Sequence, residues 1–149
     1  GLRHRSLKLA ALQKTLKTPP VFGGEDGELL VIGWGSTRGA IEEAIARLRA
    51  EGRQVSSLHL RFIQPMPGGI KEILKRFRQV MTIETNWCDK PEDQLIDESN
   101  RRFSALAMML RARYLADVDC WGEVRGQPLK PDTVYRVLSN KLAQGRQSP

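Results

Sequence analysis

Hydrophobic and polar positions along the chain change their period several times, and each change marks a boundary between a strand and a helix. Strands are predicted at residues 29–34, 55–60, 80–84 and 118–124, and the first of them begins with a continuous apolar run, Leu29 to Ile32, typical of a strand buried on both faces. Between these strands, apolar residues recur at spacings of three and four, as they do on one face of an amphipathic helix. Such helices are predicted at about residues 38–51, 70–77, 103–114 and 133–142. The predicted order of elements is therefore β-α-β-α-β-α-β-α.

This alternation predicts the class of fold. A right-handed crossover places each helix on one face of the sheet, so alternating elements build a parallel sheet with helical layers. We therefore expect an α/β fold: a doubly wound, mostly parallel sheet of four to five strands with helices on both faces, Rossmann-like and three-layered. With 149 residues, the chain is long enough to bury a sizeable core.

Both ends of the chain are expected to lie outside this domain, which spans residues 28–143. Residues 1–17 have leucines at helical spacing, and Thr18-Pro19-Pro20 stops that helix before a loop rich in glycine and acid. Residues 1–27 are therefore interpreted as a linker helix and loop from an upstream domain, and the missing initiator methionine agrees with this. Residues 144–149 are predicted to form a flexible tail.

The first strand ends in the sequence G-W-G-S-T, which predicts a tight turn into a helix. Gly33 and Gly35 allow the turn, and a hydroxyl of Ser36 or Thr37 is expected to cap the first helical N–H groups. An anion or the backbone of a partner held by the N–H groups of residues 35–37 remains the alternative. A dinucleotide fingerprint would need a glycine at Arg38, so NAD binding is not expected.

Further candidates lie at the ends of the strands, where ligands of open α/β sheets bind. Trp34 projects from the first strand, and a tryptophan in that position is more typical of an interface than of a cofactor site. Glu84 and Asn86 follow the third strand. A lone carboxylate there can act as a general base, but no histidine, serine or second carboxylate is placed to join it. Hydrogen bonding to neighbouring loops is therefore the favoured interpretation.

Charge and composition narrow the class of partner. The net charge is +7, and much of the excess precedes Glu25, the first acidic residue. This favours a solvated basic arm or a face for an acidic partner, and no nucleic-acid partner is expected, because no recognition motif accompanies the charge. No apolar run approaches the ~20 residues that cross a bilayer, so no membrane partner is expected either.

The cysteines and histidines give no metal or disulfide signature. Cys88 and Cys120 are far apart and form no C-x-x-C pair, so we expect two reduced thiols in a cytoplasmic protein. His4 and His59 are too isolated to suggest a metal pair or a catalytic diad. The sequence therefore contains no self-contained catalytic constellation, which points to a part of a larger enzyme or to a binding module.

Five motifs follow one another along the chain: L-V-I-G-W-G-S-T-R-G-A-I at 30–41, V-S-S-L-H-L-R-F-I-Q-P-M-P at 55–67, V-M-T-I-E-T-N at 80–86, M-L-R-A-R-Y-L-A-D-V at 109–118 and G-Q-P-L at 126–129. Together they resemble the C-terminal part of the alpha subunit of 2-oxoacid:ferredoxin (acceptor) oxidoreductases, particularly of the 2-oxoglutarate type. In that family this segment is a transketolase C-terminal-like domain. The family's E-x-N element is soon followed by G-Q-L, whereas here a longer polar excursion leads to Ser104-Ala105-Leu106.

The resemblance implies a role in the oxidative decarboxylation of a 2-oxoacid such as 2-oxoglutarate to its acyl-CoA. Thiamine diphosphate, magnesium, iron–sulfur clusters and CoA belong to the parent complex, and no cofactor or catalytic residue is expected in this segment. The implied partners are the upstream thiamine-binding domain, the beta subunit and, for the complex, ferredoxin; a homodimer is left open. The chain would then be a scaffold that is not active alone.

The residues expected to make partner or anion contacts share the carboxyl ends of the strands: Gly33, Trp34, Gly35, Ser36, Thr37, Arg61, Gln64, Glu84 and Asn86. A second hypothesis stays open beside the scaffold. It is a free-standing regulatory domain that binds a small ligand or a phosphate through the turn at 33–37.

Overall fold

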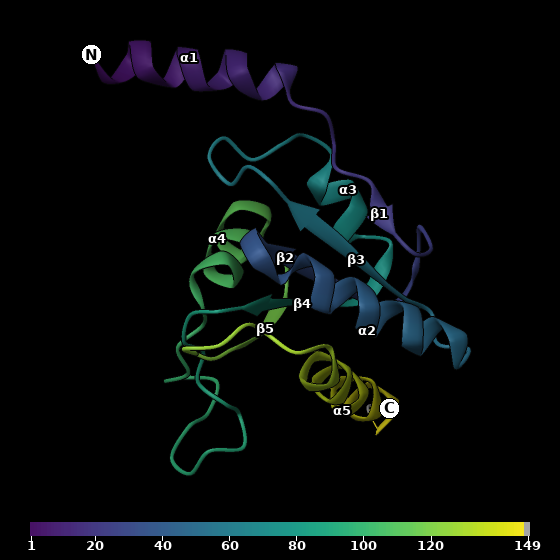
Figure 1. Cartoon of the computed structure of the whole chain (residues 1–149). Helices are drawn as coiled ribbons and strands as arrows, with labels where there is room; N and C mark the ends of the chain where they lie inside the picture. The colour runs from purple at the N-terminus through teal and green to yellow at the C-terminus, as the bar shows by residue number, and fades with distance from the viewer. Residues whose placement is uncertain (148–149) are drawn as a thin grey trace.

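The computed structural model describes residues 1–147 of the chain (Figure 1). Its elements are α1 (Leu2–Thr15), β1 (Val21–Phe22), β2 (Gly27–Trp34), the 3-10 turn η1 (Gly35–Thr37), α2 (Arg38–Ala50), β3 (Val55–Leu60), α3 (Ile70–Leu74), β4 (Phe77–Glu84), α4 (Ala105–Tyr114), β5 (Val118–Gly122) and α5 (Pro131–Gln147). The predicted alternation of strands and helices is confirmed.

The strands form one sheet in the order β1-β3-β2-β4-β5. β2, β3, β4 and β5 are parallel, and β1 pairs antiparallel with β3 at the edge. β2 is the earliest of the parallel strands, and later strands lie on both of its sides. The sheet is therefore doubly wound, with its topological switch point between β2 and β4, and the predicted fold class is confirmed.

Helices cover both faces of the sheet and enclose two hydrophobic cores (Figure 1). Successive residues of β2 supply opposite cores: Leu29 and Val31 pack with α2 and α5, while Leu30 and Ile32 pack with α3 and α4. All four side chains are fully buried. Each such burial contributes about 1.5–3 kcal/mol, which explains why the strand is apolar at every position rather than at every second one.

Most element boundaries differ from the predicted ones by one or more residues, and three of these differences change the assignment of a segment. Val21 and Phe22 form an edge strand that was predicted to lie in the approach and loop, because a strand of two residues has no detectable period. Phe77 begins β4 instead of ending the second helix. Its apolar position fits a helical face and an inward strand position equally well. The last helix continues to Gln147, so the tail predicted from residue 144 is helical up to there; residues 148–149 lie outside the described residues.

The N-terminal segment forms the predicted helix, but α1 extends away from the sheet and buries none of its residues (Figure 1). Its leucines remain uncovered, and Leu12 is 46% exposed. Two hydrogen bonds fasten the approach to the domain. The side-chain amide of Gln13 donates to the Met66 carbonyl at 2.7 Å, and the Thr18 hydroxyl donates to the Gly68 carbonyl at 2.7 Å.

The interpretation of the cysteines was wrong, because Cys88 and Cys120 are bonded to each other in the structure. The chain leaving β4 folds back beside β5, which brings the two Cα atoms to 6.6 Å. The pair is separated by 32 residues in sequence, so only the tertiary fold reveals it. The polar excursion that follows is also held by the buried Asp89, whose carboxylate accepts hydrogen bonds from Arg102 and from the indole of Trp87.

Candidate functional site at the carboxyl edge of the sheet

The expected site residues share one edge of the sheet, because the strands that precede them are parallel. Trp34 lies beside Leu60 in the β2–β3 register, and Ile32 lies beside Thr82 in the β2–β4 register. β4 continues to Glu84 at the same edge. This is the edge at which the switch point opens, and Trp34 and Glu84 lie at it.

The turn after β2 depends on its two glycines. A Cβ on Gly33 would lie 2.5 Å from Cδ1 of Ile41 and 2.7 Å from Oγ1 of Thr37, so only glycine lets α2 pack this closely. Gly35 has φ of +67°, a left-handed conformation that favours glycine. The expected hydroxyl cap is absent: Thr37 instead donates to the Trp34 carbonyl at 3.0 Å, and α2 has no side-chain cap. Ser36 is exposed beside it.

Glu84 is 1% exposed and binds the start of α4. Oε1 accepts from the Leu106 backbone N–H at 2.8 Å and, at 3.3 Å, from the Asn86 amide. Oε2 accepts from the hydroxyls of Ser104 and Thr82 and from a further backbone N–H of α4. A carboxylate placed at the positive end of a helix stabilises it. Glu84 therefore acts as the N-terminal cap of α4, as the hydrogen-bonding interpretation expected, and its acceptor positions are occupied.

Asn86 completes the same arrangement. Its amide donates to Glu84, and its carbonyl oxygen accepts from the Ala105 backbone N–H at 3.3 Å. Both residues of the E-x-N element thus face the helix that begins at Ser104-Ala105-Leu106. The sequence pattern identified the two acceptors but missed Thr82 and Ser104, the hydroxyl donors on Glu84. Their serine and threonine side chains have no distinguishing period, so sequence alone offers no signal for them.

Arg61 lies apart from this network, in the loop that follows β3. It borders a cavity of about 430 Å³ between that loop, the start of α2 and the approach segment. The basic side chains around it are Lys17, Arg38, His59 and Arg61, and the rest of the wall is mainly apolar. Gln64 is exposed farther along the same loop. The site predicted as one cluster is therefore divided into a turn, a capped helix and a basic cavity.

The pKa of His59 is affected by the charged residues around this cavity. Burial lowers its pKa most, and the guanidinium group of Arg38 lowers it further; Glu42 opposes this, and Arg61 makes the smallest contribution, which lowers the pKa. Its Nδ1 is the only buried side-chain nitrogen or oxygen without a hydrogen-bond partner among the described residues. This environment could not be predicted from the sequence, because the residues that border the cavity come from four separate segments.

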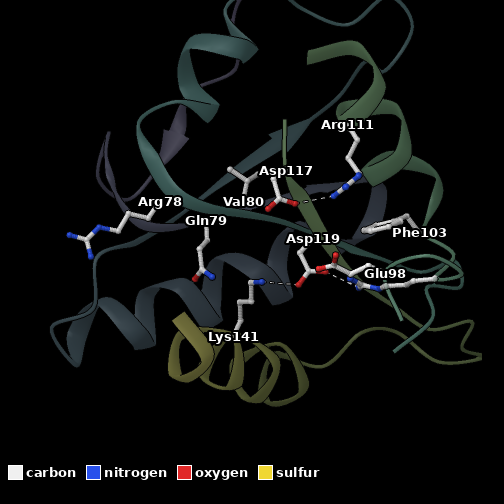
Figure 2. A pocket seen from close by; sticks show the side chains of 10 residues that line it. Arg78, Gln79, Val80, Glu98, Phe103, Arg111, Asp117, Asp119 and Lys141 are labelled. Atoms are coloured by element: carbon white, nitrogen blue, oxygen red, sulfur yellow. Dashed lines mark hydrogen bonds and ion pairs between the residues drawn. The ribbon is translucent and has the colours of Figure 1, made fainter. Parts of the chain in front are cut away.

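A second cavity, of about 540 Å³, lies at the opposite edge of the sheet near the starts of β4 and β5 (Figure 2). Five of its seven charged lining residues are paired with one another. Arg101 and Lys141 contact Asp119 at 2.7 and 2.9 Å, and Arg111 contacts Asp117 at 3.1 Å. Burial alone would raise the pKa of Asp119, but the hydrogen bond and charge of Lys141 lower it overall. These ion pairs join α4, α5 and the polar excursion to β5 and its approach, so we assign these charged residues a structural role.

The comparisons with known proteins agree with this fold and its motifs. A family model described as pyruvate:ferredoxin oxidoreductase core domain II matches residues 27–121, from β2 into β5. The chain belongs to this family. Core domain II is thus the segment whose motifs resemble the alpha subunit of 2-oxoacid:ferredoxin oxidoreductases, and the expected family is confirmed.

Relatives of this core domain II are parts of longer subunits. The 2-oxoglutarate oxidoreductase subunit KorA of Mycobacterium tuberculosis is 36% identical over 118 residues, which cover 79% of this chain and 16% of that protein. The alpha subunit of 2-oxoacid:ferredoxin oxidoreductase 1 from Aeropyrum pernix is 42% identical over 69 residues, or 44% of this chain and 11% of that one. The chain thus spans about a sixth or less of the length of these relatives.

Solved structures extend the agreement on fold. The 2-oxoglutarate:ferredoxin oxidoreductase of Magnetococcus marinus matches with a TM-score of 0.72 at 23% identity, over 89% of this chain and 21% of that one. A split-gene transketolase, in an inactive beta4 tetramer, matches with a TM-score of 0.56 at 18% identity, over 86% and 43% of the two chains. The core domain II fold is therefore transketolase-like.

The donor groups among the described residues do not fit the magnesium ion or the iron–sulfur clusters that the family implies. Magnesium with a diphosphate needs several oxygen ligands in one place, and an iron–sulfur cluster needs free thiolates. Within residues 1–147, no three His, Cys, Asp or Glu side chains form a group that could hold a metal ion, and the two cysteines are bonded to each other. No helix in that range is long and apolar enough to span a bilayer.

Proposed function

We propose that this chain is the non-catalytic scaffold domain of a 2-oxoacid:ferredoxin oxidoreductase alpha subunit, of the 2-oxoglutarate type. In this proposal the complete enzyme decarboxylates a 2-oxoacid oxidatively to an acyl-CoA, with thiamine diphosphate, magnesium, iron–sulfur clusters and CoA held by other domains. The partners are the upstream thiamine-binding domain and the beta subunit, with ferredoxin as the acceptor for the complex. The chain is placed in the cytoplasm with that enzyme.

The observation that supports a scaffold most strongly is the position of Glu84. It is the one carboxylate at the carboxyl edge that the sequence offers as a general base. Its two oxygens accept hydrogen bonds from Thr82, Ser104, Asn86 and the first N–H groups of α4. A general base must reach a substrate proton, whereas this carboxylate is buried and its acceptors are in use. We infer that this part of the edge serves for docking rather than for proton transfer.

Trp34 supplies a surface for that docking. Its side chain is 43% exposed at the end of β2. The residues on either side of it, Gly33 and Gly35, have no side chains that could cover it. Exposed tryptophans at interfaces often contribute a large share of the binding energy. In a complex of alpha and beta subunits, Trp34→Ala is expected to weaken assembly at least about tenfold, which corresponds to ~1.4 kcal/mol.

The test uses the complete alpha subunit that contains this domain, mixed with the beta subunit and analysed by native mass spectrometry. Phe22→Ala is the matched control, because Phe22 is a 40% exposed aromatic residue that lies on the edge strand β1 instead. Equal assembly of both variants and the wild type would refute docking through Trp34. Turnover of 2-oxoglutarate by the 149-residue chain alone, supplied with thiamine diphosphate, CoA and an electron acceptor, would overturn the scaffold proposal itself.

A further inference from the structure

The cavity beside Arg61 has the construction of an anion site that the scaffold role does not require. Its charged and titratable lining groups are Lys17, Arg38, His59 and Arg61, and no carboxylate lines it. Glu42 lies next to it and pairs with Arg38 at 3.0 Å. Lys17 and Arg61 have no ion-pair partner within the described part of the chain. Two positive charges therefore remain uncompensated at the mouth of one cavity.

Tertiary hydrogen bonds hold the two walls of the cavity together. The Thr18 hydroxyl bonds the Gly68 carbonyl and the Gln13 amide bonds the Met66 carbonyl, so the approach segment is fastened to the loop after β3 at two points. Lys17 and Arg61 line the same cavity from these two segments. Met66 is fully buried, which anchors the loop side of the wall.

The remaining wall fits the organic part of a small molecule. Leu16, Pro19, Pro20, Phe62 and Pro67 border the cavity, and Phe62 is 48% exposed with its ring available for contact. A volume of about 430 Å³ lies in the range of small-molecule pockets. An apolar wall with a few convergent cations is the usual composition of a site for an organic anion.

We propose that this cavity binds a small organic dianion, a phosphate ester or a dicarboxylate, with its charge between Lys17 and Arg61. Guanidinium and ammonium groups donate charge-assisted hydrogen bonds to either kind of oxygen. The ligand is held by side chains of the approach segment and of the loop after β3, and not by the backbone N–H groups of the turn at 33–37. The proposal is independent of the scaffold role.

His59 is a built-in reporter of occupancy. Its pKa is lowered first by burial and then by Arg38, is raised by Glu42, and is lowered least by Arg61. A dianion beside Arg61 adds negative charge next to the cavity and offsets that guanidinium, so the pKa of His59 should rise when the site fills. The chain has two histidines, and His4 lies exposed on α1 away from the cavity. His4 thus serves as the internal reference in the same sample.

The experiment follows the imidazole C–H signals of both histidines by NMR against pH in the 149-residue chain. Phenyl phosphate and succinate are the probes, and sodium chloride at equal ionic strength is the control. The expected result is a rise in the pKa of His59 with at least one probe and no change at His4. A response to phenyl phosphate alone identifies a phosphate-ester site, and a response to succinate alone identifies a dicarboxylate site.

Two variants make the assignment specific. Arg61→Gln removes one exposed cation of the site and is expected to raise the dissociation constant about tenfold. Arg3→Gln makes the same change on exposed α1 and is expected to leave binding unchanged. Urea unfolding of both variants checks that each still folds. The proposal fails if neither probe moves His59 beyond the chloride control, or if the two variants bind the probe equally.

Discussion

Replacement of Glu84 by glutamine tests how the carboxyl edge is stabilised. The change keeps the size of the side chain but removes its negative charge and one acceptor oxygen. In the native chain, Oε1 and Oε2 accept from the Leu106 and Ala107 backbone N–H groups at 2.8 and 3.3 Å. The hydroxyls of Thr82 and Ser104 can rotate to accept from the new amide, but a backbone N–H cannot.

The expected loss follows from these contacts. One backbone N–H of α4 is left without an acceptor in a buried position, which costs about 1–3 kcal/mol. Loss of a buried negative charge at the helix N-terminus costs a further ~1–2 kcal/mol. We therefore expect Glu84→Gln to lower the free energy of unfolding by about 3 kcal/mol and the Tm by roughly 6–12 °C.

Urea unfolding followed by circular dichroism measures this loss. Hydrogen exchange of the Leu106 and Ala107 amides then locates it in α4. Glu43→Gln is the control, because Glu43 is exposed on α2 and has no ion pair in the structure, so a change within ~0.5 kcal/mol is expected. A loss below about 1 kcal/mol for Glu84→Gln, with unchanged exchange in α4, would refute the capping role.

Three further changes test other parts of the fold. Gly33→Ala places a methyl group 2.5 Å from a side chain of α2 and should cost about 1–3 kcal/mol in urea unfolding, whereas Gly39→Ala, with nothing within 4 Å, should be neutral or stabilising. Reduction of the disulfide, whose ends are 32 residues apart, should lower stability by up to ~3–4 kcal/mol; an unchanged Tm with reductant would contradict this. Because the pKa of Asp119 is lowered, its stabilisation is present above the unfolded value near 3.9 and is lost as pH falls through the folded value. Lys141→Met should therefore weaken the dependence of stability on pH below about 5, and an identical profile would contradict the assignment.

The sequence predicted those features of the fold that depend on local period. The strand at Val55–Leu60 has its predicted bounds, because apolar residues mark both of its ends and a turn at Gly52 precedes it. Phe77 was misplaced since one apolar residue cannot distinguish the end of a helix from the start of a strand. The disulfide and the edge strand β1 are consequences of which strands become neighbours, and no local pattern encodes that.

In the candidate site, too, local sequence pattern predicted some residues, and tertiary contacts determine the others. The E-x-N element predicted acceptors at the end of β4, but the donors on Glu84 come from Thr82 within the strand and from Ser104 beyond the excursion. The basic cavity combines residues from the approach segment, α2, β3 and the following loop. Its cations resemble ordinary surface residues in sequence, and only their shared position without carboxylates distinguishes them.

The capping of α4 by Glu84 also explains why an anion site would lie on the β3 side of the sheet. In doubly wound sheets, the switch point binds anions because a helix N-terminus opens there. Here the N-terminus of α4 is occupied by the chain's own carboxylate, Glu84. An incoming anion at that position would meet a buried negative charge. Uncompensated positive charge is found instead beyond β3, at Lys17 and Arg61, where fixed side chains rather than a helix dipole supply the attraction.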